Sequence, residues 1–254
     1  GSLAMRLAIL RTGQTNAAIR ASFPDYPDLY ENLLNNGASR IKGAFSFRYF
    51  AVFNGEMPAD PDEFDGYIIT GSAAGVYEDH DWLKPLFAFI EKCDALKKPL
   101  CGICFGHQAV AKALGGEVVK WADGWGVGVR DMQITAHADW MPKTDKMSLI
   151  YFHQDQVIQL PEGAKKLATS EFCAIGAFAK GRHIFCLQGH PEFPADYSAA
   201  LLEAIREKVG DSRTEAALTS LSEHTDAQEV AQWIADFFLQ AHLASADKTP
   251  IKTA

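Results

Sequence analysis

Residues 99–108 read PLCGICFGHQ, a short apolar run followed by a cysteine between two glycines. Residues 99–104 have the bounded apolar pattern of a buried strand. Residues 107–114 carry apolar side chains at helical spacing and end before a pair of glycines, which predicts a helix. The segment therefore predicts a strand that turns sharply into a helix, the unit from which α/β folds are built.

The same alternation extends to both sides of this segment. Further apolar strands are predicted at 5–10, 45–53 and 65–70, and helices at 28–36 and 82–96. After residue 116 the pattern changes to strands joined by turns, followed by two helices. These strands are predicted at residues 117–134, 149–152, 166–169 and 173–187, and these helices at residues 195–208 and 227–243. The sequence predicts a three-layer α/β fold whose central sheet is mostly parallel and flanked by helices, with a smaller antiparallel section.

The composition favours one cytosolic globular domain. The chain has 254 residues, of which 48% are hydrophobic and 22% charged, enough to bury one substantial core. We expect residues 1–4 to be an expression scar, 5–243 to form a single domain and 244–254 to be a mobile tail. No signal pattern or membrane-length apolar stretch is recognisable, which predicts a cytoplasmic protein without a membrane partner. The net charge of −8 is well mixed and indicates no nucleic-acid partner.

Cys104 has the setting of a nucleophile. Gly102-Ile103-Cys104-Phe105-Gly106 is the cysteine version of the nucleophile elbow, in which the flanking glycines remove side chains that would collide across the turn. The start of the predicted helix favours a thiolate over a thiol. The backbone N–H of Phe105 can then donate to the oxyanion of a tetrahedral intermediate. The strand, glycines, cysteine and helix together predict a catalytic thiol rather than one more buried cysteine.

The cysteine pattern also allows a redox interpretation. Cys101 and Cys104 form a C-x-x-C pair, which can mark a thiol–disulfide oxidoreductase. In that motif the first cysteine usually attacks and caps the helix, whereas Cys101 falls inside the predicted strand. No second C-x-x-C is present for a zinc site. The five cysteines, an odd number without a signal peptide, argue against a disulfide framework.

A cysteine hydrolase needs a histidine base and a group that orients it, and two pairs qualify. These are His190 with Glu192, and His153 with Asp155. Residues two apart in an extended segment point the same way, so each carboxylate could reach its imidazole. Pro191 favours the first pair because it stiffens the segment, but the spacing leaves both open. A metal site built from all four residues would leave the cysteine elbow unexplained, so no metal or cofactor is predicted.

At this point the motifs resemble those of the class I glutamine amidotransferase family. The resemblance rests on residues 101–108 (CGICFGHQ), 189–192 (GHPE), 70–79 (TGSAAGVYED) and 153–157 (HQDQV), and covers roughly residues 40–195. It is strongest to stand-alone members similar to the glutaminase domain of GMP synthetase. The resemblance implies the flavodoxin-like fold of that family, with Cys104 as nucleophile, His190 as base and Glu192 as its partner.

The resemblance also implies a substrate site. Gln108, one helical turn after the nucleophile, matches the glutamine that contacts the γ-glutamyl substrate. The loop at Gly71 and Ser72 matches the loop that gives the second oxyanion-hole N–H. His153 and Asp155 match a motif beside the pocket, where they either contact the substrate or fix a turn.

The implied reaction is thiolate attack on the γ-carboxamide of glutamine, followed by hydrolysis of a γ-glutamyl thioester. The chain has no recognisable phosphate loop or synthetase segment to consume ammonia. An ammonia donor would therefore require an ammonia-accepting synthetase subunit as partner. Similar stand-alone chains are γ-glutamyl peptidases, which remove a larger amine from the same acyl group. A non-catalytic binding domain is a third interpretation, against which the intact Cys–His–Glu set weighs.

Overall fold

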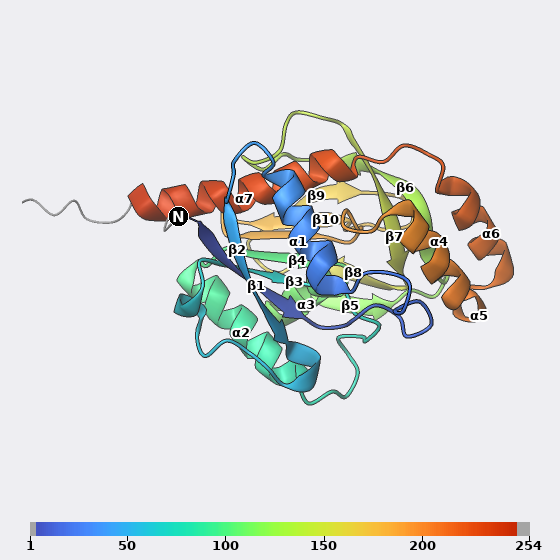
Figure 1. The fold of residues 1–254 in the computed structure, drawn as a ribbon, viewed down its shortest axis with the longest axis horizontal. Helices are drawn as coiled ribbons and strands as arrows, with labels where there is room; N and C mark the ends of the chain where they lie inside the picture. Colours follow the sequence, from blue (N-terminus) through green and yellow to red (C-terminus); the bar gives the residue numbers. More distant parts are fainter. Residues whose placement is uncertain (1–3, 248–254) are drawn as a thin grey trace, which may run out of the picture.

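The computed structural model describes residues 4–247, and these form one central sheet with helices on both faces (Figure 1). The strands of the large sheet run in the order β2-β1-β3-β4-β11-β10-β9-β6-β7, and β5 pairs with β8 in a separate two-stranded sheet. The strands are β1 Met5–Arg11, β2 Phe45–Ala51, β3 Gly66–Ile69, β4 Leu100–Ile103, β5 Glu117–Lys120, β6 Gly126–Ile134, β7 Lys146–His153, β8 Asp155–Gln159, β9 Ala164–Thr169, β10 Ala177–Lys180 and β11 Ile184–Leu187. The helices are α1 Tyr26–Gly37, α2 Leu83–Leu96, α3 Phe105–Ala113, α4 Ala195–Ala204, α5 Arg206–Val209, α6 Asp211–Ser220 and α7 Ala227–Asp247, with 3-10 turns at Val52–Asn54 and Pro61–Glu63.

The large sheet has a parallel and an antiparallel half. From β2 to β11 every neighbouring pair is parallel, and from β11 to β7 every pair is antiparallel. The predicted α/β architecture, a helix-flanked sheet with parallel strands and an antiparallel section, is confirmed. Parallel neighbours bring their carboxyl ends to the same edge, so the segments that follow β3, β4 and β11 meet there.

Two apolar layers separate the sheet from its helices. Alternate residues of β1 point to opposite faces, because the side chains of a strand alternate with a period of two. Leu7 and Ile9 join the core beneath α1 and α7, whereas Ala8 and Leu10 join the core beneath α2 and α3. Figure 1 shows α1 and α7 together on one side of the sheet and α2 on the other. The predicted three-layer arrangement follows from this alternation.

Several predicted elements differ from those observed. The strand predicted at 117–134 is interrupted before Gly126, and its two parts, β5 and β6, belong to different sheets. Gly124, with a φ of +93°, lies in that interruption and adopts a conformation that side chains disfavour. The strand predicted at 173–187 is the hairpin β10–β11, and the helix α6 was not predicted.

The predicted scar at the start of the chain and the predicted tail at its end are only partly covered by the described residues. Helix α7 continues to Asp247, past the predicted end at residue 243, and the rest of the predicted tail lies outside the described residues. Of the predicted expression scar, residues 1–3 likewise lie outside them. None of the helices within residues 4–247 is long and apolar enough to cross a membrane.

Candidate active site

Cys104 lies in the sharp turn between β4 and α3. Its backbone has a φ of 54° and a ψ of −105°, a strained conformation for a residue with a side chain. A Cβ at Gly102 would lie 2.4 Å from the carbonyl oxygen of Gly106, and one at Gly106 would lie 2.2 Å from that of Ile69. Only glycines fit at these two positions, as the sequence predicted, because the first turn of α3 lies directly against the strand ends.

The thiol of Cys104 faces a small set of polar groups. Its Sγ lies 3.6 Å from the carbonyl oxygen of Phe152 and accepts a hydrogen bond of 3.5 Å from Nε2 of Gln188. The residue is 6% exposed and stands at the N-terminus of α3, where the helix dipole stabilises negative charge. Cys101 is fully buried in β4, and burial raises its pKa well above the ordinary value. Cys101 is therefore not placed to attack a substrate from solvent, which counts against the redox interpretation.

His190 and Glu192 reach Cys104 through strand pairing. Strand β11 runs parallel to β4, and the backbone N–H of Cys104 donates to the carbonyl of Leu187 at 2.9 Å. Three residues later, the N–H of His190 donates to the carbonyl of Ile150 on β7, which ties the antiparallel half of the sheet to the site. Nδ1 of His190 lies 2.8 Å from Oε2 of Glu192. The ring of Phe193 stacks on the imidazole at 4.1 Å and fixes its plane.

The charge of Glu192 controls the titration of His190. Burial alone would lower the pKa of His190, but the charges of Glu192 and Cys104 outweigh it and raise the pKa to about 10. The same carboxylate oxygen accepts a hydrogen bond of 2.7 Å from the hydroxyl of Tyr30. The side chains of His190, Glu192 and Tyr30 are all buried, so water does not screen these contacts. The arrangement holds an imidazolium next to the thiol at neutral pH.

His153 and Asp155, the second predicted pair, do not form a carboxylate–imidazole contact. Strand β7 ends at His153 and β8 begins at Asp155, so the backbone changes direction between them. Nδ1 of His153 lies 3.0 Å from the backbone oxygen of Asp155, and the Asp155 carboxylate instead accepts a hydrogen bond of 2.6 Å from Tyr77. Burial lowers the pKa of His153 to about 4, so its ring is neutral. The metal alternative from these two pairs loses support, because Asp155 turns toward Tyr77.

Gln108 is buried beside the thiol, with its amide held by protein groups. Its Nε2 donates to the backbone oxygen of Asp155 at 3.0 Å and to Oε1 of Gln188 at 3.2 Å. Gln188 in turn donates to the Cys104 thiol. The sequence did not identify Gln188, although it directly follows the core strand that leads to His190. Gln108 therefore contributes to the site by fixing the start of β8 and the position of Gln188.

The two predicted oxyanion-hole segments lie on either side of Cys104. The N–H of Gly71 donates to the hydroxyl of Tyr30 at 3.0 Å and is therefore occupied. The backbone N–H groups of Ser72 and Phe105 donate to no acceptor among residues 4–247, and both residues line the cavity at the thiol. Of the predicted donors, Ser72 and Phe105 are thus available to a substrate oxygen. Tyr30, which links this loop to Glu192, had no local signal in the sequence because 162 positions separate it from Glu192.

A cavity of about 290 Å³ opens onto Cys104 and His190. Its size is at the lower end of the range for small-molecule sites. Charged side chains of both signs line the cavity, together with aromatic residues: Glu78, Lys120, Asp155, Lys208, Tyr26, Tyr77, Trp125, Phe152, Phe193 and Tyr197. The cavity is therefore suited to a small substrate that carries charges of both signs.

Known proteins resemble the chain in sequence and fold. The profile of the family described as glutamine amidotransferase class-I matches residues 31–203. Gamma-glutamyl peptidase 3 of Arabidopsis thaliana is 37% identical over 153 residues, which are 57% of this chain and 61% of that protein. The chain thus matches less than two thirds of the length of that relative.

A second relative matches over more of its length. A gamma-glutamyl-L-1-hydroxyisopropylamide hydrolase of Pseudomonas sp is 30% identical over 237 residues, 83% of this chain and 76% of that enzyme. Among solved structures, a glutamine amidotransferase from Thermotoga maritima superposes with a TM-score of 0.71 and 22% identity, covering 94% of this chain and 98% of that one. At that identity the superposition shows a common fold.

Proposed function

The chain belongs to the class I glutamine amidotransferase family, and we propose that it hydrolyses γ-glutamyl amide bonds with Cys104, His190 and Glu192 as catalytic triad. The Cys104 thiolate attacks the γ-carbonyl carbon, and the resulting tetrahedral intermediate expels the amine, which takes a proton from His190. Water, deprotonated by His190, then attacks the γ-glutamyl thioester. Glutamate leaves and the thiol is restored.

The observation that carries this proposal is the buried contact between His190 and Glu192 beside the strained cysteine. The 2.8 Å contact to Oε2 orients the ring, and the raised pKa supports a proton held at His190 for the leaving amine. Glu192 serves as the orienting partner because its carboxylate fixes the tautomer and stabilises the imidazolium. The hydroxyl of Tyr30 donates to the same carboxylate oxygen and holds it in place.

The free backbone donors support an oxyanion hole at Ser72 and Phe105. Phe105 is the first residue of α3, where N–H groups have no partner within the helix. The Ser72 N–H belongs to the loop after β3, which faces Cys104 across the turn. Two donors fixed in this way favour the tetrahedral oxyanion over the planar carbonyl.

The charged side chains that line the cavity support recognition of the α-amino and α-carboxylate groups of a γ-glutamyl substrate. Glu78 and Asp155 supply negative charge there. The backbone N–H of Gly75, and after it His80, lowers the pKa of Glu78, and the charge of Lys120 makes a smaller contribution in the same direction at both carboxylates. Burial nevertheless raises the pKa of Asp155, which an ammonium ligand would reverse. In this proposal Asp155 and Glu78 face the α-ammonium group, Lys120 faces the α-carboxylate, and Gln108 and His153 hold the start of β8 in place.

The leaving group is the point on which the family's activities divide. We favour a γ-glutamyl peptide or amide over free glutamine, because relatives named for γ-glutamyl hydrolysis match the chain and Trp125 lines both this cavity and a larger one. An ammonia donor would instead need an acceptor subunit and a closed route to it.

Steady-state kinetics on the purified chain test this proposal. Glutamine and a panel of γ-glutamyl dipeptides and tripeptides are compared at equal concentration, with Cys104→Ser as the inactive control. We expect release of glutamate from the peptides without any added protein. Glutaminase activity that appears only with a second protein, with the peptides untouched, would contradict the preference for γ-glutamyl peptides.

A further inference from the structure

A second and larger cavity lies next to the catalytic one. Its volume is about 800 Å³, and Trp125 lines both cavities. Phe172, on the wall of the larger cavity, meets the ring of His153 edge-on at 6.0 Å, and His153 lines the catalytic cavity. The two cavities are therefore neighbours, separated by aromatic side chains rather than by a layer of the fold.

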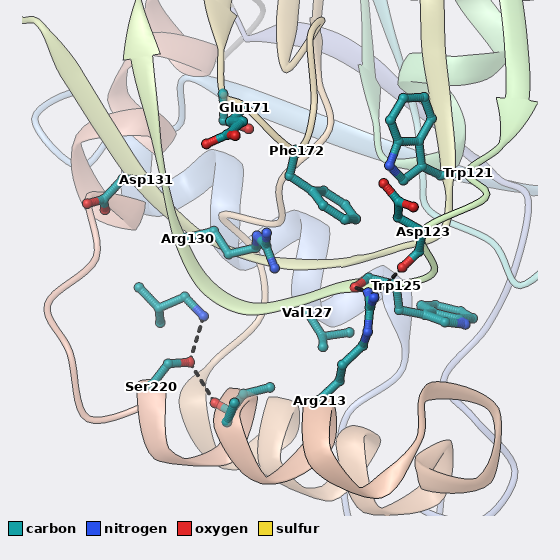
Figure 2. A pocket seen from close by; sticks show the side chains of 14 residues that line it. Trp121, Asp123, Trp125, Val127, Arg130, Asp131, Glu171, Phe172, Arg213 and Ser220 are labelled. Atoms are coloured by element: carbon teal, nitrogen blue, oxygen red, sulfur yellow. Dashed lines mark hydrogen bonds between the residues drawn. The ribbon is translucent and has the colours of Figure 1, made fainter.

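The larger cavity contains an arginine, Arg130, that forms no ion pair with a carboxylate in residues 4–247. Arg130 projects from β6 into the cavity, whereas its neighbour Asp131 points to the opposite side of the strand (Figure 2). Its guanidinium lies over the ring of Phe172, 4.5 Å from the centroid. Within residues 4–247 no carboxylate lies within 4.0 Å of it and no group accepts a hydrogen bond from it. A half-buried guanidinium in this state is incompletely solvated and attracts an anion.

A second guanidinium adds to the positive potential. Arg213 of α6 donates to the backbone oxygens of Asp123 and Trp125 and has no carboxylate partner among the described residues (Figure 2). Burial, and after it the charge of Arg213, lowers the pKa of Arg130. Two unneutralised cations facing one cavity repel each other, and an anionic ligand relieves that repulsion.

The acidic residues of the wall do not neutralise this pair. Asp131 accepts a hydrogen bond from Ser148 and lies 3.4 Å from Nζ of Lys146. Asp123 and Glu171 are exposed at the rim and form no ion pair with either arginine in the described part of the chain. The cavity thus contains the Arg130 guanidinium beside aromatic side chains, and the acidic residues of its wall, Asp123, Asp131 and Glu171, are exposed.

Building on the proposed function, we infer that the larger cavity binds the leaving-group half of the substrate, a peptide whose C-terminal carboxylate is held by Arg130. The γ-glutamyl half occupies the catalytic cavity, and the peptide passes Trp125. Trp121, Trp125 and Phe172 supply apolar surface for its side chains. Since Trp125 and Phe172 stand between the cavities, the carboxylate belongs to a residue beyond the one joined to the γ-carbonyl. The substrate class is a γ-glutamyl tripeptide or longer acid.

The test compares γ-Glu-Ala-Gly, its C-terminal amide and glutamine as substrates of the full chain. We expect the free acid to have a kcat/KM about 10- to 100-fold above that of the amide, the range typical of a charge-assisted hydrogen bond. Arg130→Gln should raise KM for the acid by that factor and leave the amide and glutamine unchanged. Arg130→Lys, which keeps the charge, should retain much of the preference, and Arg48→Gln on the distant strand β2 should change nothing.

Calorimetry on Cys104→Ala separates this inference from the proposed function, because it needs no turnover. The free acid should bind more tightly than the amide, and Arg130→Gln should abolish the difference. If the acid binds tightly but the wild-type protein does not hydrolyse it, the proposed function is contradicted and the carboxylate subsite is supported. Equal binding and equal turnover of acid and amide would overturn the subsite while hydrolysis stands. Equally tight binding of free Ala-Gly or inorganic phosphate would also overturn it, as an unspecific anion site.

Discussion

His190 and His153 are each followed two residues later by a carboxylic acid, yet their imidazole rings make different contacts in the folded chain. After β11 the chain bends at Gln188 and Gly189 and turns at Pro191 and Glu192, and on this path the His190 ring and the Glu192 carboxylate meet at 2.8 Å. After β7 the chain turns, so His153 meets only the backbone oxygen of Asp155. The pKa is raised to about 10 for His190 and lowered to about 4 for His153.

The comparison shows that spacing alone does not define a catalytic dyad. Both imidazoles are buried, and burial lowers the pKa of each. Only His190 has a buried carboxylate that reverses this effect, so only His190 can carry a proton at neutral pH. His153 is neutral and acts as a wall between the cavities.

The largest expected effect separates the two histidines. His190→Ala should lower kcat for γ-glutamyl hydrolysis by about 10,000- to 1,000,000-fold, as for loss of the base in other triads. His153→Ala should change kcat by less than about 10-fold, with KM more affected, because the ring only shapes the cavity. Steady-state kinetics with thermal melts as folding control measure both. Similar kcat losses at unchanged KM would mean that the roles are wrongly divided.

The next largest expected effect distinguishes the two carboxylates, Glu192 and Asp155. Glu192→Gln should lower kcat by about 1,000- to 10,000-fold, because an amide cannot stabilise the imidazolium or fix its tautomer. Asp155→Asn should act mainly on KM, through the α-ammonium group of the substrate. An Asp155→Asn variant that loses kcat as severely as Glu192→Gln would reverse our assignment of the two pairs.

Tyr30 offers a smaller test of how Glu192 is positioned. Its hydroxyl accepts from the Gly71 N–H and donates to Glu192, so Tyr30→Phe should lower kcat by about 10-fold and leave KM unchanged. Tyr151→Phe is the matched control, because the buried hydroxyl of Tyr151 has no partner among the described residues. Equal effects of the two substitutions on kcat would reduce Tyr30 to a packing residue.

The smallest expected effect is the pH dependence of stability. The folded pKa of His190 lies above the unfolded value of 6.5, so its protonation stabilises the fold fully below about pH 6.5. This contribution is lost as the pH rises toward about 10. Denaturant unfolding between pH 6.5 and 10 should therefore show falling stability in the wild type and a flatter profile in Glu192→Gln. Parallel profiles would show that Glu192 does not raise the pKa.

The strand–turn–helix at Cys104 was predictable because every determinant is local: the apolar run, Gly102, Gly106 and the following helix. The spacing could not decide between the histidine pairs, since the choice depends on the backbone path after β7 and β11. Pro191 favoured His190 modestly, and the family resemblance settled the choice. Tyr30 could not be found, since it reaches Glu192 through the packing of α1 on the sheet. The position of Gln188 beside the thiol depends on the parallel pairing of β11 with β4, and the residues around Gln188 carry no sequence signal of that pairing.

The central claim is that Cys104 carries the γ-glutamyl group. The direct measurement is mass spectrometry of protein treated with a glutamine-like chloroketone, followed by digestion and mapping of the adduct. Cys104 and Cys101 stand three residues apart, and only Cys104 lies at the cavity. We predict a single adduct on Cys104 that is absent from Cys104→Ser, with competition by γ-Glu-Ala-Gly. An adduct mainly on Cys101, or labelling unchanged by Cys104→Ser, would contradict the account.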